Sequence, residues 1–339
     1  MKYIHWFLGA TLLLGAIPSY ANTAWSLGAA EGYNVFVFGS YSTWGWSSID
    51  GSTAVGGSFS SMGSMGLDQT PGAADPAISG LVVGGSLALA GGQVNGDAWI
   101  GGATSSTLYG TLTVTGDFHY GSAPSGHVNV YGTETALHGS PLPIDFVTAA
   151  TSLTQLSNDL TNVAANGAVT GNSSNYTLTA TGCTLCVFNL TGGSMHSITI
   201  DAPEGATVLV NVSGSSSSFS NGSISYTGGA TAANTIFNFG ATTALSTSGI
   251  GFNGSILAPL ATFTGANGQI NGELIAKAVS GQSAAFKSGN IFSGDLNSGI
   301  GATTGASPAP TPEPATWLSL LTAVAAFVGF QKRRSGKRN

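Results

Sequence analysis

Val82-Val83-Gly84-Gly85-Ser86 decides how this chain folds, because it joins a short apolar run to a pair of glycines. The same arrangement stands earlier, at Ala54-Val55-Gly56-Gly57-Ser58, and later, at Trp99-Ile100-Gly101-Gly102. An apolar run bordered by glycine predicts a β-strand that ends at a corner, where glycine tolerates a positive φ. The first glycines of the three pairs are 28 and 17 residues apart. This spacing excludes a strict short repeat and favours an irregular β-solenoid whose turns carry insertions.

Further short runs with β-branched residues and Gly, Asn or Ser borders follow along the body of the chain, residues 22–306. They are found at residues 34–39, 81–85, 111–114, 128–131, 197–200, 208–212 and 235–239. Such runs are typical of β-strands. We therefore predict a mainly β fold, an irregular parallel β-solenoid that is β-helix-like and right-handed. A β-sandwich also uses short strands and is the alternative.

Residues 144–165 differ from the rest of the body and predict one long α-helix. Apolar side chains recur there at helical spacing and form a single stripe. They are Phe146, Ala149, Leu153, Leu156, Leu160 and Val163. Two prolines precede the segment, and Asn166-Gly167 supplies the residues that commonly end a helix. We expect this helix to flank the solenoid and to cover an apolar face by packing.

The composition excludes several classes of protein. Only 6% of the 339 residues are charged and 42% are hydrophobic, with 51 glycines. An average protein has about 25% charged residues, and a disordered chain combines low hydrophobicity with high net charge. Between Glu31 and Asp295 the body holds thirteen acidic residues against Lys277 and Lys287, a net charge of −11. Because a nucleic-acid site needs a basic patch, we expect no nucleic-acid partner.

The first 21 residues predict a signal peptide for export by the Sec route. Lys2 supplies a positive start, and residues 6–17 form a largely apolar run. Small residues at Ser19 and Ala21 then stand where signal peptidase requires them. Cleavage is expected between Ala21 and Asn22.

The other end of the chain has three parts in succession. Residues 307–314 form a proline-rich linker, and an uncharged segment at 315–331 follows it. The segment Ala315 to Phe330 would reach about 24 Å as a helix, somewhat short of a hydrocarbon core of about 30 Å. The basic residues of the tail, 332–339, would stay cytoplasmic by the positive-inside rule. A membrane-spanning segment with the body outside is expected, and a plain anchor helix is the alternative to a sorting signal.

This tail resembles the PEP-CTERM sorting signal, and its motif stands here as Pro312-Glu313-Pro314. The resemblance implies that an exosortase, a membrane processing enzyme, cuts near the motif. It also implies a Gram-negative bacterium that makes exopolysaccharide. The expected location is therefore transient anchoring in the inner membrane, followed by the cell surface or the surrounding matrix.

The body resembles the choice-of-anchor A domain over residues 27–295. Three stretches carry the resemblance. They are residues 31–39 with 49–57, Ile144-Asp145-Phe146 at the start of the predicted helix, and residues 252–259 with 270–277. The resemblance implies an adhesive module with a β-helix-like fold, and it carries no catalytic residues. The loop Ser42-Thr43-Trp44-Gly45-Trp46 departs from the family pattern.

Cys183 and Cys186 are the only two cysteines, and they stand in a C-x-x-C spacing. In an exported protein this spacing favours a local disulfide, and the alternatives are free buried thiols or a redox pair. Metal-ligand spacings are absent around the histidines, so we expect no metal and no cofactor. The glycine-rich stretch 91–97 lacks the regular repetition of a calcium loop.

An aromatic cluster at Tyr41, Trp44 and Trp46, near Tyr33, is a candidate ligand platform, with core packing as its alternative. The predicted function is a non-enzymatic adhesin associated with the cell envelope or exopolysaccharide. One alternative is an enzyme that acts on polysaccharide, which requires Asp97, Asp117 and Lys277 to converge in one cleft. The other is an ice-binding-like surface protein, which requires a flat array of threonines that no regular T-x-T pattern supports.

Overall fold

The computed structural model describes residues 25–45, 47–68, 78–106, 110–282 and 284–298. All of them lie in a compact unit whose boundary is at Gly299. Within these residues no helix is long and apolar enough to cross a membrane. The signal peptide, the Pro312-Glu313-Pro314 motif, the segment 315–331 and the basic tail lie outside the described residues.

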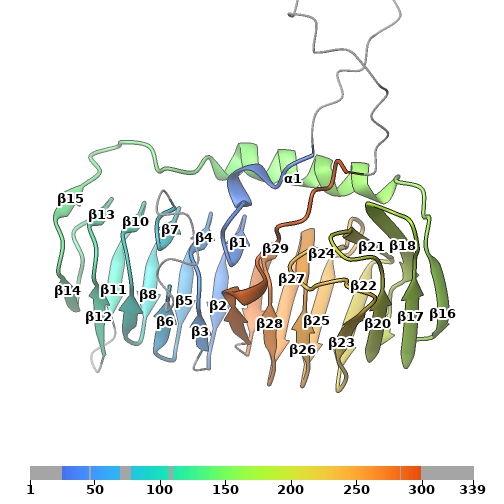
Figure 1. Ribbon diagram of the computed structural model, residues 1–339. Coiled ribbons are helices and arrows are strands. Elements are labelled where there is room, and N and C mark those ends of the chain that lie inside the picture. The colour runs from blue at the N-terminus through green and yellow to red at the C-terminus, as the bar shows by residue number, and fades with distance from the viewer. Residues whose placement is uncertain (1–24, 46, 69–77, 107–109, 283, 299–339) are drawn as a thin grey trace, which may run out of the picture. The chain divides into compact units, whose positions relative to one another are not determined.

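The unit is a β-solenoid, as predicted, and it has three faces (Figure 1). The strands pair in parallel, except that β16 pairs antiparallel with β17 at one end of the third face. The helix face is named after the helix that covers it. Its strands, in spatial order, are β15 (Glu134–Ala136), β13 (Phe118–Tyr120), β10 (Ala98–Ile100), β7 (Leu81–Val83), β4 (Thr53–Val55), β1 (Val35–Val37), β29 (Leu274–Gly281), β27 (Ser255–Ala266), β24 (Thr235–Asn238), β21 (Thr207–Ser213) and β18 (Leu185–Thr191).

The second face continues from the helix face around a corner, and the later parts of β27 and β29 belong to it. Its strands, in spatial order, are β11 (Thr104–Ser106), β8 (Leu87–Leu89), β5 (Phe59–Ser61), β2 (Tyr41–Thr43), the ends of β29 and β27, β25 (Ala244–Ser248), β22 (Ser216–Ser220) and β19 (Ser194–Met195).

The third face closes each turn. One part of it contains β14 (His127–Val130), β12 (Thr111–Val114), β9 (Gly92–Val94), β6 (Met65–Leu67), β3 (Ser47–Ile49), β30 (Ala285–Lys287), β28 (Gln269–Asn271) and β26 (Gly251–Asn253). The other part contains β23 (Ile224–Thr227), β20 (Ser197–Asp201), β17 (Asn175–Thr179) and β16 (Ala168–Asn172). A bridge between Ser223 and Gly251 joins the two parts. The 3-10 turns η1 (Gly28–Ala30) and η2 (Ser288–Asn290) complete the elements.

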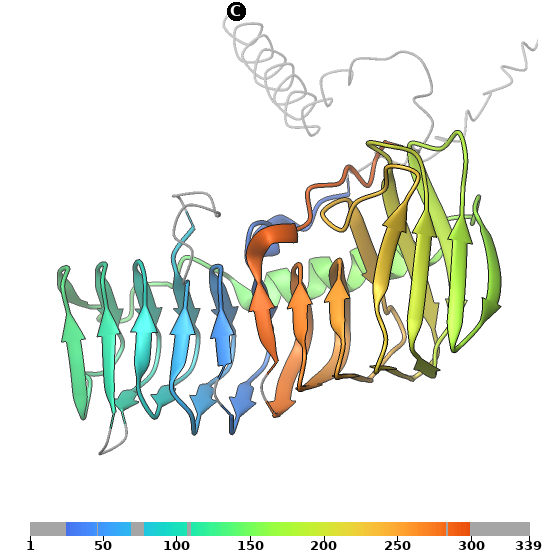
Figure 2. The ribbon, with the colours of Figure 1, turned by 60° about the horizontal axis from the view of Figure 1, so that its bottom comes forward.

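The order of the turns in space differs from their order in the sequence. Strand β1 pairs in parallel with β4 on one side and with β29 on the other, so Val35 lies between Thr53 and Leu274. The first half of the chain therefore builds from the middle to one end. The second half starts at the opposite end and returns to the middle (Figures 1 and 2). We call the junction of these first and last turns the seam.

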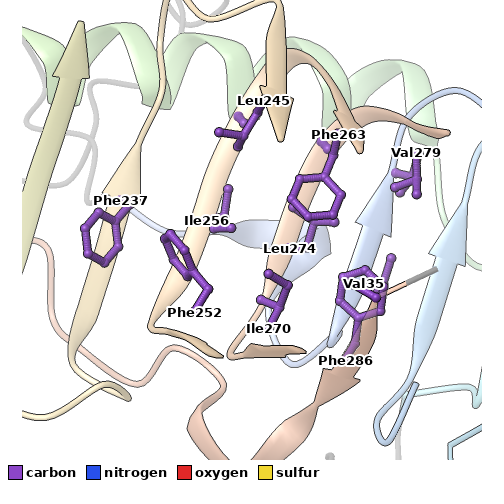
Figure 3. Packing of buried hydrophobic residues seen from close by; sticks show 14 of the residues in the cluster. Val35, Phe237, Leu245, Phe252, Ile256, Phe263, Ile270, Leu274, Val279 and Phe286 are labelled. Carbon is purple, nitrogen blue, oxygen red and sulfur yellow. The ribbon is translucent and has the colours of Figure 1, made fainter. Parts of the chain in front are cut away.

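The interior is filled from all three faces by apolar side chains. Phe237, Phe252, Phe263 and Phe286 are buried there, and Figure 3 shows them beside Ile256, Ile270 and Leu274 from neighbouring turns. Val35 from the first turn packs in the same cluster. Burial of this stack, at about 25 cal/mol per Å² of apolar surface, holds the two halves of the chain together.

Helix α1 (Phe146–Thr161) lies across the helix face (Figure 1). It is shorter than the predicted 144–165, because Asp145 is the N-cap and Asn162 ends the helix. Its buried stripe contains Ala149, Leu153, Leu156 and Leu160. This stripe packs on a cluster of outward-facing strand residues that includes Phe36, Leu257 and Ile275. The helix thus bridges turns from both halves of the chain.

Removal of the helix cap gives the first testable prediction. The Asp145 carboxylate accepts hydrogen bonds from the N–H groups of Val147 at 3.0 Å and Thr148 at 3.1 Å. Replacement of Asp145 with alanine should lower the Tm by a few degrees, because two N–H groups lose their acceptor. Thermal unfolding followed by circular dichroism checks this. Asp159→Ala, near the other end of the same helix, is the control; an equal loss in both variants would contradict a capping role.

Candidate functional site

The second face carries one continuous row of small outward-facing side chains, which we call the hydroxyl row. Each member lies opposite its neighbour in the parallel register of the strands, except for Thr264 and Ser280, which directly follow the last paired residues of β27 and β29, Phe263 and Val279. The row is Ser105, Ala88, Ser60, Ser42, Ser280, Thr264, Ser246, Ser218 and Ser194. A further bridge continues it from Ser105 to Ser125. Hydroxyl groups therefore occupy every position except Ala88.

The local sequence explains why these residues face outward. Successive side chains of a strand point to opposite sides, so a small residue between two buried ones must face solvent. Ser42 lies between buried Tyr41 and Thr43, and Ser60 lies between buried Phe59 and Ser61. Strand spacing of about 4.8 Å places one hydroxyl per turn, over a row of roughly 40 Å.

Hydroxyl groups interact within the row and also lie beside it. The Ser60 hydroxyl donates to the Ser42 hydroxyl at 3.2 Å. The strands β22 and β25, near the β19 end of the face, have five residues each. A shallow depression of about 290 Å³ opens there. Hydroxyl side chains surround it, from Ser194, Ser216, Ser218, Ser246, Thr262 and Thr264. The second face thus exposes many hydrogen-bond donors and acceptors to a ligand.

The second face is also uncharged. Its strand segments contain no Asp, Glu, His, Lys or Arg among the described residues. The other faces differ, since α1 covers the helix face and the third face carries the ion pair of Lys287 and Asp50 at 3.2 Å. Among the described residues, the strand segments of the second face therefore form an extended polar surface without formal charge.

Two large apolar side chains border the hydroxyl row. Trp44 directly follows β2 and is 61% exposed, and Met62 directly follows β5 and is 80% exposed. They belong to adjacent turns, because Thr43 pairs with Ser61 and the Met62 N–H donates to the Thr43 carbonyl at 3.1 Å. An exposed indole side chain therefore stands two residues after Ser42 of the hydroxyl row.

Comparison with known proteins assigns this architecture to a family. A family model described as "Putative Ice-binding-like adhesive domain" matches residues 26–288, which is most of the chain. The chain belongs to this family. The match supports the predicted adhesive character, and residues 26–288 are called the adhesive domain below.

Solved structures similar to the adhesive domain include ice-binding proteins. One, from an Antarctic biological consortium, is 16% identical, with 78% of this chain and 90% of that chain covered and a TM-score of 0.36. Another, from the Antarctic ascomycete Antarctomyces psychrotrophicus, is 14% identical, with 78% and 98% covered and a TM-score of 0.35. A third, from an Arctic yeast, is 14% identical, with 78% and 94% covered and a TM-score of 0.34. The search of curated proteins found no match.

The candidate aromatic platform is only partly present in the adhesive domain. Tyr41 is fully buried, with its ring centroid 4.6 Å from that of Phe59, so it cannot offer a ring face to a ligand. It points inward because its neighbour Ser42 occupies the outward position of the strand. Tyr33 is also buried, and Trp46 lies outside the described residues. Trp44 is thus the exposed aromatic residue of this group that the structure describes.

The remaining predicted residues of the adhesive domain have structural roles. Cys183 and Cys186 form a disulfide at the start of β18. Asp97 and Asp117 lie in neighbouring turns, where each carboxylate accepts an N–H of the next turn at 2.8 Å. The described residues contain no group of three or more His, Cys, Asp or Glu side chains that could hold a metal ion.

The cleft required by the enzymatic alternative does not form. Asp97 directly precedes β10, whereas Lys277 lies within β29, and β7, β4 and β1 separate these two strands. Four strand spacings of about 4.8 Å keep the two residues roughly 19 Å apart along the stack. Asp97, Asp117 and Lys277 therefore do not converge.

The hydroxyl row itself was missed by sequence reasoning, which looked for a T-x-T ladder. The row takes one residue from each strand, and most of its members are serine. Its members become neighbours only through pairing between turns of unequal length. A usable signal exists in each strand, namely a small hydroxyl residue between two residues that face inward, as in Phe263-Thr264-Gly265.

Proposed function

We propose that this protein is an exported, non-enzymatic adhesin that attaches to exopolysaccharide through the second face. The hydroxyl row carries the proposal, because it is a long, uncharged and uncovered array of hydrogen-bonding groups. Sec export with cleavage after Ala21 would deliver the domain outside the cell. Exosortase processing near Pro312-Glu313-Pro314, with transient inner-membrane anchoring at 315–331, would release it to the surface or matrix of a Gram-negative bacterium.

Steric blocking of the row tests the attachment. Ser42→Tyr combined with Ser246→Tyr places two bulky rings on the row, at positions that accept aromatic residues because they face outward in strands. We expect binding of the full chain to exopolysaccharide from the producing organism to weaken at least tenfold, measured by surface plasmon resonance. The matched control is Gln93→Tyr with Thr113→Tyr, on paired strands of the third face.

The control variant should bind as the unchanged protein does. Equal binding by the second-face variant and the unchanged protein would overturn the proposed function. Circular dichroism of both variants should match the unchanged protein, since all four positions lie on the outer surface of strands.

Ice binding is the second candidate function. The observation that favours it is the constant spacing of one hydroxyl per turn on an uncovered sheet, together with the ice-binding-like description of the family. Thermal hysteresis and inhibition of ice recrystallisation, measured on the unchanged protein and the same two double variants, test it. Activity that only the second-face variant loses would support ice as the ligand.

A further inference from the structure

We infer that the ligand of the second face is a neutral, extended polysaccharide that runs along the solenoid axis and stacks a sugar ring on Trp44. This inference rests on the proposed function and names the ligand class of the same face. It assigns Trp44 and Met62 to the binding surface, beside Ser42 and Ser60 of the hydroxyl row.

The exposure of Trp44 and Met62 is the first step of the argument. Burial of apolar surface is the main stabilising term in folding. Trp44 and Met62 stay exposed, although Tyr41 and Phe59, in the strands that precede them, are fully buried. Adjacent exposed apolar groups rimmed by polar residues mark interaction sites. The ligand should therefore have an apolar face as well as polar groups.

A sugar ring has that combination. Its C–H groups form an apolar face that packs on an indole ring, and its hydroxyl groups point outward around the ring edge. Trp44 stands two residues after Ser42, so a ring stacked on the indole lies beside the row and can exchange hydrogen bonds with it. The hydroxyls recur at about 4.8 Å, a length comparable with one pyranose unit of an extended chain. A glycan parallel to the axis thus meets equivalent partners at successive turns.

The charge distribution selects a neutral glycan. The parts of the strands that form the second face carry no charged residue, and Lys277 lies at the corner of β29, three residues before Ser280. The body as a whole carries thirteen acidic residues against two lysines, so its carboxylates would repel an anionic polysaccharide. A neutral chain is not repelled.

The border of the row favours a flexible chain over a flat crystal surface. Trp44 and Met62 belong to neighbouring turns at the edge of the row, and both are largely exposed. A flexible polymer can contact the row and both of these apolar side chains together, wherever they lie relative to the plane of the row. The ligand is therefore a chain molecule in this proposal, and ice becomes an outcome of the test.

The test measures binding of the full chain to three probes: the neutral β-glucan laminarin, the anionic polysaccharide alginate, and ice. Isothermal titration calorimetry should detect laminarin with at least tenfold higher affinity than alginate. Trp44→Ala should weaken laminarin binding at least tenfold, while Trp44→Tyr, which keeps a flat ring, should stay within threefold. The matched control is Tyr131→Ala, because Tyr131 is also an aromatic residue, is 77% exposed and follows β14 on the third face.

The outcomes separate the inference from the proposed function. Equal affinity for alginate, unchanged laminarin binding in Trp44→Ala, or ice-binding activity that requires the hydroxyl row would overturn the inference. If exopolysaccharide binding still depends on Ser42 and Ser246 in those cases, the inference fails and the proposed function is retained. Loss of laminarin binding in Trp44→Ala and not in Tyr131→Ala supports the inference.

Discussion

Replacement of Glu273 with glutamine is expected to remove a loss of stability that the protein suffers as the pH rises from 4 to 7. Glu273 lies at the seam and is fully buried, and neither of its carboxylate oxygens has a hydrogen-bond partner. Burial raises the pKa of this carboxyl group well above its usual range, and the nearby Glu31 raises the pKa further. The folded protein therefore holds a proton that the unfolded chain releases.

The sign of the effect follows from this difference. Stability associated with the raised pKa is complete below the pKa of the unfolded carboxyl group and is lost as the pH rises toward the pKa of the folded state. Each pH unit between the ordinary pKa and the raised pKa of the folded state costs about 1.4 kcal/mol, so the loss accumulates as the pH rises toward 7. Glutamine has a similar shape and does not titrate, so the free energy of unfolding of the glutamine variant does not show this loss as the pH rises.

Urea unfolding at pH 4, 5, 6 and 7 measures the effect. The free energy of unfolding of the glutamine variant, minus that of the unchanged protein, should increase steadily with pH. Glu31→Gln should give a smaller change of the same sign, because it removes the neighbouring charge. Glu204→Gln, at an exposed position, is the control. Parallel curves for Glu273→Gln and the unchanged protein would contradict the account.

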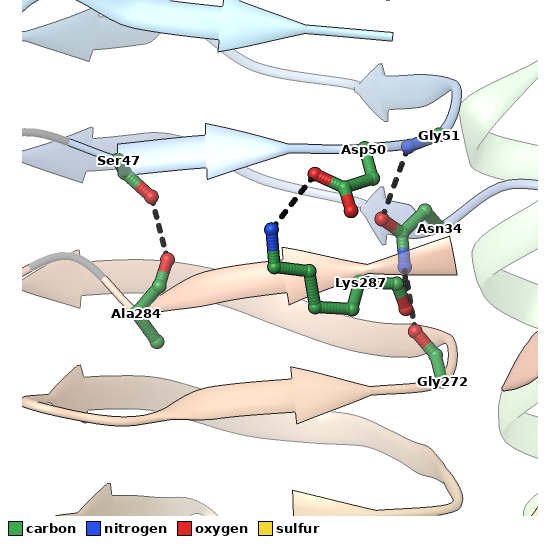
Figure 4. A network of polar contacts seen from close by, with 7 residues as sticks. All are labelled: Asn34, Ser47, Asp50, Gly51, Gly272, Ala284 and Lys287. Atoms are coloured by element: carbon green, nitrogen blue, oxygen red, sulfur yellow. Dashed lines mark hydrogen bonds and ion pairs between the residues drawn. The ribbon is translucent and has the colours of Figure 1, made fainter. Parts of the chain in front are cut away.

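Replacement of Asn34 with alanine should lower the free energy of unfolding by about 2–4 kcal/mol, because buried backbone groups lose their partners. Asn34 is fully buried and ties the first turn to the last (Figure 4). Its amide group donates to the carbonyl of Gly272 at 2.6 Å and to that of Lys287 at 3.3 Å. Its side-chain oxygen accepts from the N–H of Gly51 at 3.2 Å.

The seam makes Asn34 more important than an asparagine elsewhere in the sheet. Asn34 and Gly272 are 238 positions apart, so chain connectivity does not hold their two turns together. The Lys287–Asp50 ion pair and a hydrogen bond from Ser47 to the Ala284 carbonyl support the same junction at its outer surface. Exposed ion pairs contribute about 0–1 kcal/mol, so the buried asparagine should dominate.

Urea unfolding at a single pH measures this prediction. Asn129→Ala, an exposed asparagine in β14, is the matched control and should change the free energy of unfolding by less than about 0.5 kcal/mol. Equal effects at the two positions would show that the seam does not depend on Asn34.

Much of the fold follows from local pattern. Glycine pairs such as Gly56-Gly57 and Gly84-Gly85 stand at corners, and a side chain at Gly84 would collide with the Gly56 carbonyl oxygen. The apolar stripe of residues 146–163 specifies a helix and the face that it buries. The local disulfide alternative for Cys183 and Cys186 likewise needs only two residues that are close in sequence.

The candidate site is different in this respect. Ser42 and Ser280 become neighbours only because β2 pairs with β29, and nothing near either residue specifies that partner. The buried state of Tyr41 depends on which side of β2 faces the interior. Local pattern therefore grouped Trp44, which is exposed, with Tyr41, which is buried, and did not reveal the row.

The sequence by itself determined the strands, their glycine corners and the flanking helix, because each of these depends on residues within a few positions of one another. Only the tertiary structure decided that the first turn lies in the middle of the stack and that single hydroxyls from many strands line up in one row. The physical reason is that the register between strands depends on packing and hydrogen bonds across more than 200 residues, whose energies no local segment contains.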